Sequence, residues 1–209
     1  MKLIRLLSAI VMAGTLAFTT ARAIVIHEDF SAAGPGGSPY VRGWTAVGDT
    51  NLFVWNSAAG HLEVTWDSSK PNSFFYQPLG MTLNKTHDFS VSFDLMLSSI
   101  GSLPGKDGAM QVAVGFINLA QATAPGYYRA TGMDSPNLVE FNYFHDTGFG
   151  ATISPVAIST NHQYALNFST FLFELQLSQL YRVEMRYVAN DQTLYTVLKQ
   201  NGTNVFEVD

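Results

Sequence analysis

A cluster of chemically active residue types lies in VEFNYFHDTGFGATISP, residues 139–155. Glu140 and Asn142 are two positions apart, so on a β-strand they project from the same face. His145 and Asp146 follow within four residues. Two carboxylic acids about 5–5.5 Å apart can hydrolyse a glycosidic bond, and histidine can also transfer a proton. The stretch is therefore a candidate catalytic strand, a candidate floor of a sugar-binding groove, or an ordinary strand of the core.

The third interpretation makes Glu140 a member of an ion pair. Between Lys106 and Arg182 the sequence holds a single basic residue, Arg129. Arg129 is therefore a candidate partner of Glu140. Such a pair either stabilises the fold or holds a sugar hydroxyl.

Aromatic and polar residues that suit a carbohydrate gather in two loops, TAPGYYRATGMDSPN and NYFHDTGFG. Sugars are bound by aromatic faces with planar polar groups around them. We expect the ligand-binding residues to be Glu140, Asn142, His145, Asp146, Phe149, Tyr127, Tyr128 and Arg129. In the alternative interpretation, the tyrosines and Phe149 only seal one end of the folded domain.

The elements that must position these residues are short strands. Strict alternation of apolar and polar residues marks DFSVSFDLML, MQVAVGFI, YRVEMRYV and QTLYTVLKQ. Further candidate strands cover residues 23–30, 52–55, 62–66, 73–78, 138–144, 151–158, 164–168 and 173–177. Turn-forming segments such as GPGGSP and LPGKDG separate them, and helical periodicity is absent apart from one turn at 178–180. The pattern predicts an all-β fold, an antiparallel β-sandwich or jelly roll, with a closed barrel as the alternative.

Composition and the N-terminus indicate an exported protein. Residues 1–23 combine two early basic residues, an apolar run and an A-x-A cleavage pattern, so we expect a secretory signal peptide followed by one domain at 24–209. Without this leader, 8 basic residues face 16 acidic ones, a net charge of −8. That balance argues against nucleic acid as a partner. The mature chain holds no expected transmembrane segment, and it has no cysteine for disulfides or thiolate sites.

The hairpin LYRVEMRYVANDQTLYTVLKQNG and the strand DFSVSFDLML resemble the concanavalin A-like lectin/glucanase superfamily, the laminin G-like jelly rolls. VTWDSSKPNSFFYQPLG, SPNLVEFNYF and GFGATISP resemble an uncharacterised group of secreted bacterial proteins with this predicted fold. The glucanases use Glu-x-Asp-x-x-Glu, whereas this chain has Glu140-x-Asn142-x-x-His145. Lectins of the superfamily often bind Ca²⁺, which makes WDSSKPN and HDTG candidate calcium segments, although neither is densely acidic.

The resemblance implies a non-catalytic, lectin-like domain that binds a glycan or a cell-surface polymer. The alternatives are a glycoside hydrolase of the β-sandwich glucanase type and a structural or adhesion domain without a small ligand. We expect extracellular, periplasmic or cell-surface location. A jelly roll returns its last strand beside its first, and here the sequence stops at NVFEVD. We therefore expect the domain to lack its last strand, which would leave an exposed edge.

Overall fold

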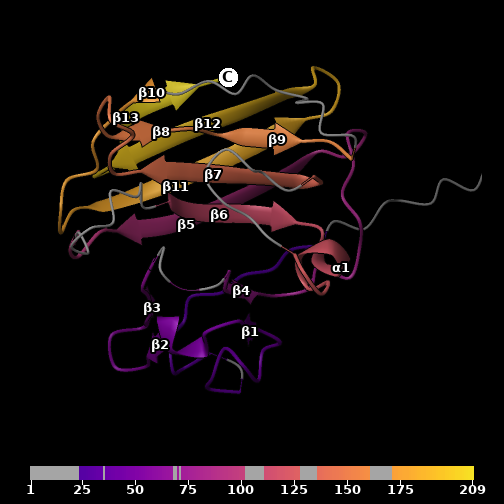
Figure 1. Ribbon diagram of the computed structural model, residues 1–209, viewed down its shortest axis with the longest axis vertical. Coiled ribbons are helices and arrows are strands. Elements are labelled where there is room, and N and C mark those ends of the chain that lie inside the picture. The colour runs from indigo at the N-terminus through magenta and orange to yellow at the C-terminus, as the bar shows by residue number, and fades with distance from the viewer. Residues whose placement is uncertain are drawn as a thin grey trace, which may run out of the picture.

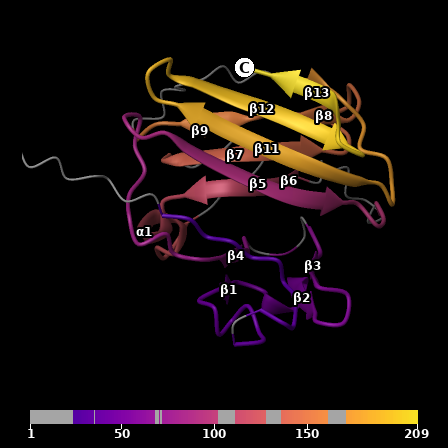
Figure 2. The same ribbon diagram turned by 180° about the vertical axis from the view of Figure 1, so that it is seen from behind.

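The computed structural model describes residues 24–34, 36–67, 70, 72–101, 111–127, 136–160 and 171–209. Two antiparallel sheets dominate it and lie face to face (Figures 1 and 2). The β11 sheet has the order β13-β12-β11-β5, with β5 (Phe89–Met96), β11 (Leu180–Val188), β12 (Thr193–Gln200) and β13 (Thr203–Val208). The β7 sheet has the order β10-β8-β7-β6, with β6 (Gln111–Ile117), β7 (Leu138–Phe144), β8 (Thr152–Ile153) and β10 (Phe171–Leu172). β9 (Val156–Ile158) also pairs with β7.

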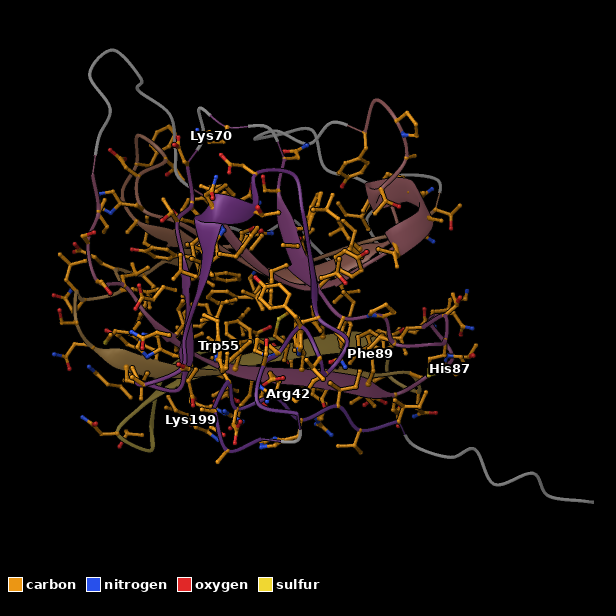
Figure 3. All side chains as sticks on the ribbon, turned by 90° about the horizontal axis from the view of Figure 1, so that it is seen from below. Arg42, Trp55, Lys70, His87, Phe89 and Lys199 are labelled. Carbon is orange, nitrogen blue, oxygen red and sulfur yellow. The ribbon has the colours of Figure 1, made fainter. Side chains whose placement is uncertain are left out.

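Alternation along the strands builds the core between these sheets. In β11, Tyr181, Val183, Met185 and Tyr187 are buried, and Arg182 lies on the opposite, exposed face. Side chains from β5, β6, β7, β8 and β12 join them in one hydrophobic cluster. Figure 3 shows side chains filling the space between the sheets. The expected all-β antiparallel sandwich is confirmed.

A small N-terminal lobe adds two short ribbons: β1 (Thr45–Val47) pairs with β4 (Phe74–Tyr76), and β2 (Phe53–Asn56) pairs with β3 (His61–Val64). A 3-10 turn, η1 (Thr50–Leu52), precedes β2. The lobe lies beside the β5 and β6 edges of the two large sheets (Figures 1 and 2). Trp66, just beyond β3, packs against the main core cluster. The lobe thus closes one side of the sandwich.

The predicted strand at 23–30 is wrong for its described part, because residues 24–30 form no strand. The Glu28 carboxylate accepts the N–H of Phe30 at 2.6 Å, a local bond that competes with a sheet ladder. The same carboxylate receives Arg42 Nε at 2.8 Å and Trp44 Nε1 at 3.0 Å. The segment is therefore fixed by side chains of the lobe. Figure 3, viewed from the lobe's side, shows where Arg42 and Trp55 lie.

Three further predictions differ from the structure. The strand expected at 151–158 is divided into β8 and β9 around Ser154-Pro155, since proline has no N–H to donate to a ladder. The strand expected at 173–177 is wrong, and β10 occupies the two residues before it. A helix was not expected at α1 (Leu119–Ala122), where the Asn118 side chain caps the first turn by accepting Gln121 N–H. The strand expected at 164–168 lies outside the described residues.

Candidate functional site

β7 places Glu140 and Asn142 on one face, as the two-residue spacing predicts. In the ladder with β6, Glu140 lies opposite Gly115 and Asn142 lies opposite Ala113. The alternate residues Phe141 and Tyr143 are fully buried in the core between the sheets. Glu140 and Asn142 therefore belong to the outer face of the β7 sheet.

That outer face concentrates the buried polar residues. Among the described residues, the buried polar and charged side chains are those of Glu140, Asn142, Thr152, Ser154 and Thr196. All of them except Thr196 lie on β7 or on the β8–β9 segment beside it. Buried polar groups are costly unless they find partners, so such a concentration requires a structural or functional reason.

Hydrogen bonds join part of this set into a row across β6, β7 and the segment between β8 and β9. Gln111 Nε2 on β6 donates to Asn142 Oδ1 at 2.7 Å. Ser154 donates its backbone N–H to the Asn142 carbonyl at 2.9 Å, which aligns the two residues side by side. The Ser154 side chain is fully buried, and its Oγ has no hydrogen-bond partner. We call Gln111, Glu140, Asn142 and Ser154 the polar row.

A glycine makes room for Glu140. A Cβ added at Gly115 would lie 2.6 Å from Glu140 Cα and 2.2 Å from the Val139 carbonyl oxygen. These are backbone atoms, so the contact cannot be relieved by turning a side chain. Sequence analysis did not single out Gly115, although a glycine inside a strand often marks close approach of another backbone.

His145 and Asp146 do not join the polar row. β7 keeps one register with β6 from Leu138 to Phe144, without the bulge that would bring a residue five positions after Glu140 to its side. Alternation puts His145 on the other face, just past the strand end, where its Nδ1 is buried without a partner. Asp146 Oδ1 instead accepts the Gly148 N–H at 2.7 Å.

The loop after β7 presents Phe149 to solvent. Thr147 donates its N–H to the Gly150 carbonyl at 3.3 Å, which closes the turn. Phe149 is 89 % exposed at its tip. An aromatic ring held outward by a hydrogen-bonded turn suits a ligand-contacting position.

The tyrosine loop is only partly described. Tyr127 packs its ring on Phe74 of β4 with a centroid distance of 5.8 Å, so it contacts the lobe. Its buried hydroxyl has no hydrogen-bond partner. Tyr128 and Arg129, and with them the predicted Arg129–Glu140 pair, lie outside the described residues.

On the inner face of β7, the apolar core shifts the pKa of Tyr143. Burial raises the pKa of Tyr143, although the hydroxyl accepts the Leu175 N–H at 3.3 Å, which opposes the rise. Tyr143 thus remains neutral and anchors Leu175 from the inner side of β7. No group of three or more acidic or histidine side chains in the described ranges is arranged to hold a metal ion.

Comparisons with known proteins add no family. No protein-family model matches the chain, and a search of curated proteins found no match. Of the helices in the described part of the chain, none is long and apolar enough to cross a membrane.

Proposed function

We propose that this protein is a secreted, non-catalytic glycan-binding domain of the concanavalin A-like jelly-roll type. The observation that carries the proposal is the polar row on the outer face of the β7 sheet. Beside the apolar cluster of Leu138, Val156 and Ile158, this face buries a carboxylate, an amide and a hydroxyl, and buried polar groups are costly without partners. Export is supported by the leader-like sequence at residues 1–23.

The row offers the chemistry that sugar hydroxyls require. Glu140 supplies acceptor oxygens, the amide of Asn142 supplies donors and an acceptor, and the Ser154 hydroxyl supplies one more donor without a present partner. Phe149 adds an exposed aromatic face at the end of β7. Asp146 lies at the same end, in the turn that holds Phe149.

Burial of the row sets the expected strength of binding. Glu140 is 5 % exposed and Asn142 is 2 % exposed, so a sugar reaches them only after the face opens. Apparent affinity falls by the fraction of molecules that are open. We therefore expect weak binding of single sugars and stronger binding of polymers, whose repeated units act together.

A glycan array probed with the protein exported from cells, with and without a chelator, tests the proposal and the calcium hypothesis together. On the best ligand, Glu140→Gln should weaken binding roughly 5- to 150-fold, because losing a hydrogen-bonding partner costs about 1–3 kcal/mol. Glu63→Gln is the matched control, since Glu63 is an exposed glutamate of the lobe. Its affinity should equal that of the wild type.

Two results would contradict the proposal. One is the absence of binding to any glycan on the array. The other is release of reducing sugar from laminarin by the wild-type protein and its loss in Glu140→Gln, which would favour a hydrolase. In the described structure the face of Glu140 on β7 carries an amide, Asn142, where a hydrolase needs its second carboxylic acid.

A further inference from the structure

The outer face of the β11 sheet carries charged residues that mostly neutralise one another. Arg182 Nη1 lies 3.1 Å from Asp94 Oδ1, and its Nη2 donates to Ser92 Oγ at 2.7 Å. Lys199 Nζ lies 2.8 Å from Glu184 Oε2. These pairs join β5, β11 and β12. The third basic residue of this face on β11 and β12 is Arg186.

Arg186 differs from the other two cations. Its guanidinium carbon lies 5.1 Å from the centre of the Tyr195 ring, the cross-strand neighbour on β12. In the part of the chain that the structure describes, no hydrogen bond or ion pair engages its N–H groups. The ring contacts the guanidinium by a cation–π interaction and leaves its N–H donors available.

A hollow of about 220 Å³ opens beside Arg186. It is lined by Asp88, Phe89, Ser90, Arg186, Tyr187 and Val188. Asp88 is also held in place, because its Oδ1 accepts the Ala189 N–H at 2.7 Å. Ser90 lies directly opposite Arg186 in the ladder between β5 and β11 and is exposed. Pockets for drug-sized ligands measure about 300–1,000 Å³, so this hollow suits a single ring.

The charges of the hollow select a neutral ligand. Asp88 and Arg186 are the charged residues of the lining, so its formal charges sum to zero and the hollow does not favour a free anion. A guanidinium donates to two neighbouring oxygens at once, and a carboxylate accepts from a hydroxyl. Neighbouring hydroxyls on a saccharide ring can bond both the guanidinium of Arg186 and the carboxylate of Asp88.

We propose that Asp88, Ser90 and Arg186 form a saccharide-binding site for a neutral sugar unit with adjacent hydroxyls. It lies on the opposite sheet from the polar row and shares no residue with it. The site can therefore be tested independently of the function proposed for the polar row.

Nuclear magnetic resonance of the full mature chain tests the site. The probes are methyl glucoside, methyl mannoside, methyl galactoside and laminarihexaose, with galacturonate and sulfate as anionic comparisons. We expect at least one neutral saccharide to shift the amide signals of residues 88–90 and 186–188. Arg186→Gln should weaken that binding roughly 5- to 150-fold, the loss expected for a removed hydrogen-bonding group.

Arg182→Gln is the matched control, because Arg182 is an exposed arginine on the same strand and face but is paired with Asp94. It should bind like the wild type. Asn142→Ala should leave the shifts at 88–90 and 186–188 intact. The site is refuted by shifts with anions alone, by no shift with any neutral saccharide, or by equal losses in Arg186→Gln and Arg182→Gln. Disappearance of these shifts in an Asn142→Ala protein whose other amide signals show the native fold would also refute it as a separate site.

Discussion

At the scale of single residues, Gly115 shows how a missing side chain shapes the candidate site. The glycine sits in the middle of β6, where a β-branched residue would ordinarily stabilise the strand. The backbone of Val139 and Glu140 occupies the space that a Cβ would need. At this point of the sheet, the backbone of β7 therefore lies too close to β6 for any side chain at position 115.

Gly115→Ala should therefore destabilise the protein by about 1–3 kcal/mol, the usual cost of overpacking a close contact. Gly101→Ala is the control, since a Cβ at Gly101 would meet nothing within 4 Å. Its free energy of unfolding should stay within about 0.5 kcal/mol of the wild type. Urea denaturation of both variants measures the difference, and equal stabilities would show that the backbone adjusts freely around residue 115.

Residues also show what the sequence could not predict. The spacing of Glu140 and Asn142 predicts a shared face, because alternation is a local property of any strand. Their burial and the bond from Gln111 depend on which strand lies alongside, and that is fixed by the whole fold. Ser154 is a similar case. The burial of its hydroxyl without a hydrogen-bond partner follows from the placement of β8 and β9 beside β7, which the sequence does not show.

At the scale of elements, the alternation of apolar and polar residues predicted the strands of the two large sheets whose side chains point alternately into and away from the core. β5, β7, β11 and β12 fall within about one residue of their expected ranges. The failures at 24–30 and 173–177 are apolar segments without a regular neighbour to pair with. An apolar run indicates burial, but a strand also requires a partner for its backbone hydrogen bonds.

The pairing order predicts which elements open last. β11 is hydrogen-bonded on both sides, by β5 and β12, and β7 is bonded by β6 and by β8 and β9. Native-state hydrogen exchange should therefore be slowest at Leu180–Val188 and Leu138–Phe144. β13 and β10, which each pair with one strand, should exchange faster. Exchange in β11 as fast as in β13 would contradict the topology.

At the scale of the whole molecule, an ion pair between Glu28 and Arg42 joins the N-terminal segment to the lobe. The Glu28 and Arg42 side chains are 6 % and 12 % exposed and lie 2.5 Å apart. Burial alone would raise the pKa of the Glu28 carboxyl. The hydrogen bonds and charge of Arg42, with the N–H groups of Phe30 and Trp44, outweigh burial and hold this pKa below its usual value of 4.5.

A carboxyl whose pKa is lowered by folding stabilises the folded state above its unfolded pKa. That contribution is lost as the pH falls from about 4.5 through the lower folded pKa. Glu28→Gln should lower the free energy of unfolding near pH 7, because it removes the charged partner of the Arg42 guanidinium. The variant should also lose stability less steeply between neutral and acidic pH than the wild type.

Denaturant titrations at several pH values measure both effects. Glu207→Gln is the control, because Glu207 is exposed on β13. Parallel stability curves for wild type and Glu28→Gln across the acidic range would show that Glu28 titrates alike in the folded and unfolded chains. The predicted link between the ion pair and acid stability would then be wrong.

The polar row has a consequence for how the chain finds its native pairing. β7 keeps one alignment with β6, β8 and β9 along its length. A slip by one residue would exchange the two faces, carrying Glu140 and Asn142 into the apolar interior and Phe141 outward. Burying a carboxylate there costs several kcal/mol, far more than moving one apolar residue past another. The row therefore favours the native register of β7 over an alignment that is shifted by one residue.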